Sequence, residues 1–124
     1  MPPAWTYLGS DIESGANVDI VQTGPYTIQR EREQYDLVIS GQTLEHVERP
    51  WLLVREMARM LKPKGWLVIT APFECPVHKH PIDCWRFLPF GFHVLFQEAG
   101  LRTVKVWLCG RLCWGVAQKG NGNG

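Results

Sequence analysis

Two continuous apolar segments separated by a helix-forming segment constrain the fold most strongly. Residues 35–40 read YDLVIS and residues 66–72 read WLVITAP. Apolar residues that run continuously, rather than alternating with polar ones, are typical of strands buried on both faces of a parallel sheet. The segment between them has apolar side chains at helical spacing, namely Leu53, Val54, Met57, Met60 and Leu61. The pattern therefore predicts a strand–helix–strand unit.

Local signals predict the remaining elements. Pro50 can be the first residue of the helix, and Pro63-Lys64-Gly65 would end it. A second helix is predicted from Pro89 to Ala99, with Gly100 as its C-cap glycine. The other predicted strands cover residues 5–12, 18–21, 101–108 and 112–116, the last two forming a hairpin. These elements predict an α/β fold whose sheet is mostly parallel, with a C-terminal antiparallel hairpin.

Length and charge restrict the class of protein. A chain of 124 residues is about one domain, which we place at residues 1–118, followed by a flexible tail at 119–124. The formal net charge of +1 gives no electrostatic preference for nucleic acid or for an anionic membrane. No apolar run approaches the ~18 residues that a membrane span needs. The first residues do not resemble a signal peptide, and four scattered cysteines do not resemble a disulfide framework, so we expect a cytoplasmic protein.

Polar residues follow three of the predicted strands. Asp11 ends the first strand, Ser40-Gly41-Gln42 ends the strand at 35–40, and Glu45 and His46 follow shortly after. Ligands in open α/β sheets bind beyond the carboxyl ends of the strands. A carboxylate at the position of Asp11 can accept hydrogen bonds from both hydroxyls of a ribose. From spacing alone, a turn-forming Asx cap at Asp11 is an equally good interpretation.

The segment FECPVHKHPIDCWRF, residues 73–87, contains residue types that bind zinc, at Cys75, His78, His80 and Cys84. The C-x2-H-x-H-x3-C spacing is cramped for one tetrahedral ion, so a zinc site is the weaker interpretation. A nucleophilic Cys84 is weaker still, because no base is fixed beside it in the sequence.

A longer run resembles a known family. The sequence YDLVISGQTLEHVERPWLLVREMARMLKPKGWLVITAP, preceded by the acidic-capped strand YLGSDI, resembles the class I S-adenosylmethionine-dependent methyltransferases, of the type 11-like kind. The segment VHKHPIDCWRFLPFGF resembles a subgroup with an H-x-HP-x-D-x-WRF motif. The resemblance implies a Rossmann-like methyltransferase fold. It also implies that the fold is incomplete, N-terminally truncated, because the first βα unit with its glycine-rich cofactor loop has no counterpart here.

The same resemblance implies roles for individual residues, with S-adenosylmethionine as the cofactor. The implied cofactor-binding residues are Asp11 at the ribose, Ile12 at the adenine, Ser40, Gly41 and Gln42 at the methionine part, and Glu45 and His46 at the edge of the site. The implied catalytic residues are His78, His80, Asp83 and Arg86. Methyl transfer is an in-line displacement that depends mainly on proximity and orientation. A general base would help only with an acceptor that holds a proton, and His78, His80 or Asp83 could supply it.

The absent βα unit leaves two functions open. Its strand would lie between the strands that end at Asp11 and Ser40, which leaves three arrangements open: the two strands pair with each other, a second copy or a partner chain completes the sheet, or the sequence is a fragment of a larger reading frame. One hypothesis is a methyltransferase, or a fragment of one, acting on an unknown small-molecule or macromolecular acceptor. The alternative is a non-catalytic interaction module with a degenerate methyltransferase fold, whose exposed strand edges would pair with a partner or with a second copy in a dimer.

Overall fold

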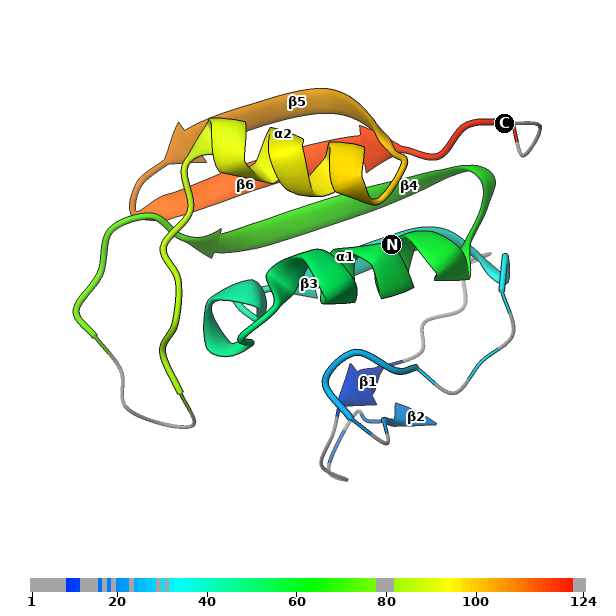
Figure 1. Cartoon of the computed structure of the whole chain (residues 1–124), viewed down its shortest axis with the longest axis horizontal. Coiled ribbons are helices and arrows are strands. Elements are labelled where there is room, and N and C mark those ends of the chain that lie inside the picture. The colour runs from blue at the N-terminus through cyan, green and yellow to red at the C-terminus, as the bar shows by residue number, and fades with distance from the viewer. Residues whose placement is uncertain are drawn as a thin grey trace.

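The computed structural model describes residues 9–11, 16, 18, 20–22, 24–28, 30, 32–77 and 82–121 (Figure 1). Its elements are β1 (Ser10–Asp11), β2 (Ile20–Val21), β3 (Tyr35–Gly41), the 3-10 helix η1 (Leu44–His46), α1 (Pro50–Met60), β4 (Leu61–Pro72), α2 (Pro89–Glu98), β5 (Arg102–Cys109) and β6 (Leu112–Gln118). The predicted strand–helix–strand unit is confirmed as β3–α1–β4. The predicted second helix and the C-terminal hairpin are confirmed as α2 and β5–β6.

The main sheet has four strands in the order β3-β4-β6-β5. β3 and β4 are parallel, whereas β6 is antiparallel to both β4 and β5. The sheet is therefore mixed, whereas the sequence led us to expect a mostly parallel sheet. The difference arises because the hairpin folds back so that β6, and not β5, lies beside β4 (Figure 1).

Both helices pack on the same face of this sheet, in front of it in Figure 1. The β4 side chains Leu67, Ile69 and Ala71 are fully buried beneath them. A Cβ atom at Gly115 on β6 would lie 2.9 Å from ring atoms of Phe92 and Phe96, so α2 approaches the backbone of β6 closely. Each fully buried Leu or Phe contributes about 1.5–3 kcal/mol to the free energy of folding. The core lies between the helices and one side of the sheet.

The ends of the helices follow the predicted signals in part. Pro50 begins α1 as predicted, but α1 ends at Met60 and β4 already starts at Leu61. The predicted stop at Pro63-Lys64-Gly65 is therefore wrong, and those residues lie within β4, with Lys64 at a φ of 67°. The predicted C-cap of α2 is confirmed, since Gly100 has a φ of 75°.

β1 and β2 pair with each other in parallel and form a separate two-stranded sheet. β3 is an edge strand of the main sheet, and no described strand pairs with its outer edge. Because β1, which ends at Asp11, belongs to the separate sheet, the predicted gap between the strands that end at Asp11 and Ser40 stays a prediction. The connection before β3 is held to α1, because Arg59 donates hydrogen bonds of 3.0 Å to the carbonyl oxygens of Ile28 and Arg30.

Two further expectations concern the ends and the surroundings of the fold. The tail boundary at residue 118 stays a prediction, although Lys119 Nζ donates to the carbonyl oxygens of Ala58 and Leu61 at 2.9 and 2.8 Å. In the described part of the chain, neither helix has the length and the apolar character required to cross a membrane.

Candidate active site at the carboxyl ends of β3 and β4

The carboxyl ends of two parallel strands bring the two predicted site segments to one edge of the sheet. Gly41 on β3 is in register with Thr70 on β4. The residue that follows β3 is still bonded to β4, because the backbone N–H of Gln42 donates to the carbonyl oxygen of Thr70 at 2.8 Å. The segment 42–46 leaves β3 at this edge, and the segment that follows Pro72 leaves β4 beside it. The strand order therefore places both segments where α/β sheets bind ligands.

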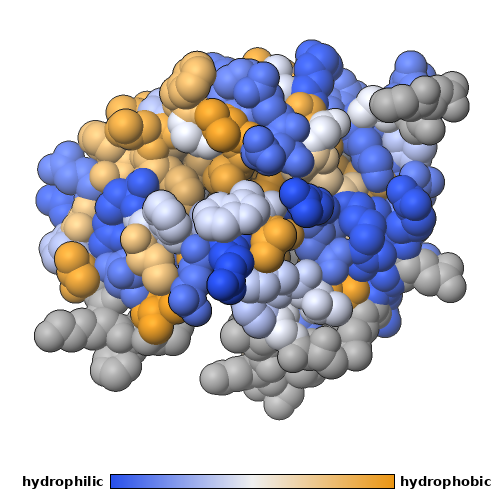
Figure 2. Space-filling model, viewed as in Figure 1, coloured by the Kyte–Doolittle hydropathy of each residue, from blue (hydrophilic) through white to orange (hydrophobic). Residues whose placement is uncertain are grey.

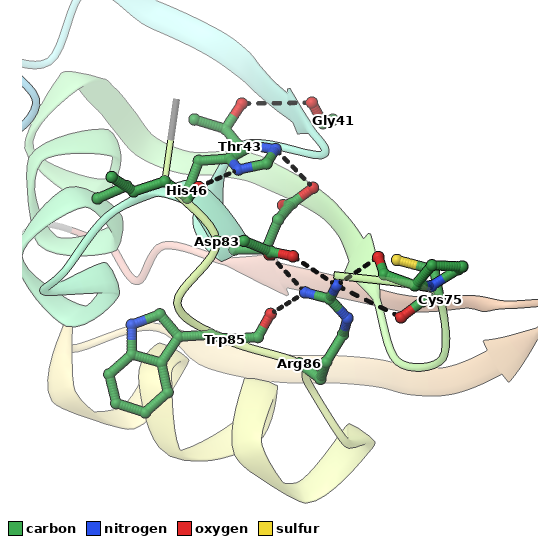
Figure 3. Close-up of polar contacts among 10 residues, drawn as sticks. Gly41, Thr43, His46, Cys75, Asp83, Trp85 and Arg86 are labelled. Atoms are coloured by element: carbon green, nitrogen blue, oxygen red, sulfur yellow. Dashed lines mark hydrogen bonds and ion pairs between the residues drawn. The ribbon is translucent and has the colours of Figure 1, made fainter. Parts of the chain in front are cut away.

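The predicted cofactor loop has an unusual backbone. Ser40 is buried, whereas Gly41 and Gln42 are exposed. Gln42 has a φ of 51°, in the left-handed region that residues other than glycine seldom adopt. Such a conformation costs on the order of 1 kcal/mol and is concentrated at functional sites. Thr43 Oγ1 donates to the carbonyl oxygen of Gly41 at 3.2 Å and closes the turn (Figure 3).

Glu45 and His46, on η1, hold the second segment against the first. The backbone carbonyl oxygen of Glu45 accepts hydrogen bonds from the N–H groups of Cys84 at 2.8 Å and Trp85 at 3.3 Å. His46 Nδ1 lies 2.6 Å from the carbonyl oxygen of Ile82 (Figure 3). A carbonyl can only accept, so Nδ1 carries the proton and donates it. Three contacts from two adjacent residues thus fix residues 82–85.

The side chain of Glu45 is buried, with 3% of the residue exposed. Its Oε2 atom lies 3.5 Å from His46 Nε2, and its Oε1 atom has no hydrogen-bond partner within the described structure. Burial raises the pKa of this carboxyl, and a backbone hydrogen bond together with the positive charges of His46 and Arg86 opposes the shift only in part.

Asp83 and Arg86 form an ion pair with each other. Arg86 Nη1 and Nη2 donate to the two carboxylate oxygens of Asp83 at 2.6 and 2.8 Å. The guanidinium also donates to the carbonyl oxygens of Trp85 at 2.8 Å, Pro76 at 3.1 Å and Cys75 at 3.4 Å (Figure 3). The Asp83 side chain is only 3% exposed, and its hydrogen bonds raise the pKa of Arg86. These contacts join both ends of the segment 75–86, so they favour a positioning role for the pair. Its catalytic role stays a prediction.

Several predicted residues are not brought to this edge by any described contact. Asp11 ends β1 in the separate two-stranded sheet, and Ile12 lies outside the described residues. His78 and His80 also lie outside them, so the zinc hypothesis and the roles of these histidines stay predictions. Cys75 and Cys84 are both free thiols. Among the residues that were placed, no three potential metal ligands lie together.

Sequence reasoning missed how Glu45, His46 and Trp85 act together. Trp85 Nε1 donates to the carbonyl oxygen of Glu48 at 3.3 Å. The edge of one ring faces the other in the pair Trp85 and Trp51, whose ring centroids are 6.4 Å apart. The adjacent Glu and His after a strand end signalled a polar site, but nothing in the sequence indicated that their partner would be residues 82–85. The resemblance assigned both to the cofactor, whereas their described contacts are with residues 82–85.

Comparisons with known proteins agree with this fold. The sequence profile described as methyltransferase domain matches residues 6–69. A ubiquinone biosynthesis O-methyltransferase of Marinobacter nauticus is 40% identical over 62 residues, which are 48% of this chain and 26% of that protein. The chain therefore spans about a quarter of the length of this curated relative.

Two solved structures resemble the chain at low sequence identity. A chain from the complex of the Haloferax volcanii Trm112 methyltransferase activator with a methyltransferase has a TM-score of 0.69 and 16% identity, covering 87% of this chain and 64% of that one. An Aquifex aeolicus S-adenosylmethionine-dependent methyltransferase has a TM-score of 0.61 and 21% identity, covering 83% of this chain and 55% of that one. Partial coverage of longer domains fits an incomplete Rossmann-like fold. The chain belongs to the methyltransferase-domain family, whose solved relatives include S-adenosylmethionine-dependent methyltransferases.

Proposed function

We propose that this chain forms part of an S-adenosylmethionine-dependent methyltransferase and supplies the edge at which cofactor and methyl acceptor meet. The observation that carries the proposal is the attachment of residues 82–85 to Glu45 and His46. The family resemblance assigns residues 40–42, 45 and 46 to the cofactor, and it implies that residues 73–87 form the substrate-side loop. Their direct hydrogen bonding is what a site that aligns two reactants requires.

The described residues fit the cofactor in part. The exposed backbone at Gly41 and Gln42 is open to a ligand, and the orphaned Oε1 of Glu45 marks a polar position with an unsatisfied acceptor. The ribose-binding role proposed for Asp11 has less support, because β1 belongs to a separate sheet. The chain's own residues therefore support the methionine end of the site better than the ribose end.

The residues of the substrate-side segment divide into two roles. Asp83 and Arg86 hold the segment closed through their ion pair, and Asp83 is not free to take a proton while it is paired. His78 and His80 remain our candidates for a general base. When bound, S-adenosylmethionine supplies the methyl group, and the segments 40–46 and 73–88 orient it toward the acceptor. The acceptor is not assigned.

Calorimetric titration with S-adenosylmethionine tests the proposal. We expect saturable heat at about one cofactor per chain, with a dissociation constant in the micromolar to millimolar range common for enzyme substrates. Gly41→Phe should weaken binding at least tenfold, because it fills the cofactor loop. A Cβ atom at Gly41 makes an ordinary contact, with Thr70 Oγ1 3.6 Å away, and circular dichroism checks that the variant folds. Gly91→Phe, on α2 with no atom within 4 Å of that position, is the matched control and should bind as the wild type does.

The alternative is a non-catalytic interaction module, which the outer edge of β3 favours because no described strand pairs with it. A folded chain that gives no heat with S-adenosylmethionine, while its mass in solution shows a complex, would replace the enzyme proposal with this one. Circular dichroism of the same sample establishes that the chain is folded.

A further inference from the structure

The candidate active site contains a buried carboxyl group whose charge is only partly balanced. The Glu45 side chain is 4% exposed, and its Oε1 atom has no hydrogen-bond partner among the described residues. Its Oε2 atom lies 3.5 Å from His46 Nε2, which is longer than an ordinary hydrogen bond to nitrogen. Buried polar groups without a partner are rare in proteins, and many of them have a functional role.

The other buried carboxyl group of the site is balanced within the chain. Asp83 accepts hydrogen bonds from both terminal nitrogens of Arg86, at 2.6 and 2.8 Å (Figure 3). Arg86 and Asp83 act on the pKa of Glu45 in opposite directions, so the pair offers Glu45 little net charge. His46 is a cation only when it is protonated. With a neutral His46, these contacts leave an ionised Glu45 without a full positive charge of its own.

The remaining described acidic residues of the segments 40–48 and 73–88 are exposed, namely Glu48 and Glu74. Hydrophilic residues cover much of the surface that Figure 2 shows, and water and salt screen charges of this kind. A charge inside the protein is screened far less, because the local dielectric constant is lower. Glu45 is therefore the described acidic residue that would attract a cation bound at this edge most strongly.

The two forms of the cofactor differ in charge at the sulfur atom. S-adenosylmethionine has a positively charged sulfonium, whereas S-adenosylhomocysteine has a neutral thioether. Their adenine, ribose and amino-acid groups are the same, so a difference in binding reports on the sulfonium and its methyl group. The resemblance assigns residues 40–42 to the methionine part, which contains this sulfur, and Glu45 follows in the same segment.

We propose that Glu45 distinguishes the charged S-adenosylmethionine from its neutral product, an inference that rests on the proposed function. The carboxylate attracts the sulfonium through the interior of the protein, so the two groups do not have to touch. When the acceptor's lone pair forms the new bond to the methyl carbon, the electron pair of the S–C bond stays on sulfur and neutralises it. The attraction then ends, so Glu45 favours binding of the substrate form and release of the product form.

The pH should control this preference through the ionisation of Glu45. Burial raises the pKa of its carboxyl, and His46, Arg86 and Asp83 are the charged or titratable groups that face it. Below the folded pKa the carboxyl is neutral and the preference is lost, whereas above it the preference is complete. A protonated His46 would repel the sulfonium, so it changes the preference in the same direction. Comparison with a Glu45 variant that keeps His46 therefore isolates the contribution of Glu45.

Calorimetric titrations with S-adenosylmethionine and with S-adenosylhomocysteine, at about pH 5, 6 and 7, test the inference. The readout is the dissociation constant of the product form divided by that of the substrate form. We expect the wild-type ratio to rise at least about fivefold across this range. Glu45→Gln should flatten most of the rise, and Glu45→Asp, which keeps the charge, should retain it. Glu48→Gln removes an exposed charge nearby and should change the ratio by less than about twofold.

Three results would overturn this inference and leave the proposed function in place. They are a wild-type ratio that does not rise with pH, an equal rise in wild type and Glu45→Gln, and a Glu48→Gln effect as large as that of Glu45→Gln. The first is measured on the wild type alone, so it decides even where a Glu45 variant does not fold. A folded wild-type chain that binds neither ligand at any pH would instead overturn the proposed function, and this inference with it.

Discussion

His46 and Ile82 are joined across the site by a hydrogen bond of 2.6 Å, from the imidazole Nδ1–H to a backbone carbonyl oxygen. The two residues are 36 positions apart in the sequence. This contact fixes the tautomer of His46 and leaves Nε2 as the only acceptor of the neutral ring. It also connects the segment after β3 to the segment after β4, and the proposed function depends on this connection.

Replacing His46 should loosen residues 82–85. His46→Ala removes one hydrogen bond and should cost about 1 kcal/mol in the free energy of unfolding. Amide hydrogen exchange at Cys84 and Trp85 should become faster, since both amides bond to the neighbouring Glu45. His46→Asn places an amide N–H near the position of Nδ1 and should restore part of the protection. Equal exchange in wild type and His46→Ala would show that the contact does not hold the segment.

Glu45 should make the stability of the protein fall as the pH rises. Burial raises the pKa of Glu45 in the folded state, so the folded chain binds its proton more tightly than the unfolded chain does. The resulting stabilisation is complete below the unfolded pKa and is lost as the pH rises through the folded pKa. Glu45→Gln stays neutral, so its unfolding free energy should fall less steeply than that of the wild type above about pH 4.5.

Urea denaturation at several pH values between 4 and 7 measures this difference. Glu48→Gln, an exposed neighbour on the same segment, is the control and should leave the slope as in the wild type. Parallel curves for wild type and Glu45→Gln would show that the Glu45 carboxyl does not titrate in this way.

The Asp83–Arg86 ion pair should contribute strongly to the free energy of unfolding, because the Asp83 side chain is buried. Arg86→Gln removes the two guanidinium hydrogen bonds to the buried Asp83 carboxylate, and breaking a pair of this kind costs on the order of 3 kcal/mol. The double variant Asp83→Asn/Arg86→Gln should recover part of the loss, because it removes the charge of Asp83 together with that of Arg86. Urea denaturation of the two single variants and the double variant gives the coupling energy.

An exposed ion pair supplies the control. Lys62 Nζ lies 3.7 Å from Asp36, with side chains that are 48% and 88% exposed. Lys62→Gln should cost no more than about 0.5 kcal/mol. An Arg86→Gln cost that is no larger would contradict a structural role for the pair.

The sequence predicted elements whose signals are local. The continuous apolar run at residues 35–40, the first-turn Pro50 and the glycine after α2 each indicated the element that the structure contains. The end of α1 was misplaced because Leu61 fits the helical apolar spacing and also belongs to β4. The position of β6 beside β4 depends on contacts between distant strands, which local patterns do not report.

The site was predictable in its location but not in its contacts. Polar residues at the ends of two parallel strands indicated where a ligand would bind. The burial of Glu45 was not predictable, because glutamate is usually exposed. Asp83 and Arg86 were predicted as separate catalytic residues, and only the three-dimensional structure shows that each is the partner of the other.

Close packing of α2 on β6 predicts opposite effects of two glycine substitutions. Gly115→Ala would place a Cβ atom 2.9 Å from both Phe92 and Phe96, and such overpacking should cost about 1–3 kcal/mol. Gly91→Ala meets nothing within 4 Å and lies in a helix, so it should stabilise the protein by up to about 1 kcal/mol. Thermal denaturation of both variants checks the pair, and a Gly115→Ala variant as stable as the wild type would contradict the packing.

The most direct test of the proposed function is an amide chemical-shift map of the ¹⁵N-labelled chain with S-adenosylhomocysteine added, which has the cofactor's shape without its methyl group. We predict that the largest shifts fall on residues 40–46 and on the described part of the segment 73–88, because both border the carboxyl ends of β3 and β4. Saturating shifts that fall mainly on α2 and the β5–β6 hairpin, or no shifts at millimolar ligand, would contradict the assignment of this edge as the cofactor site.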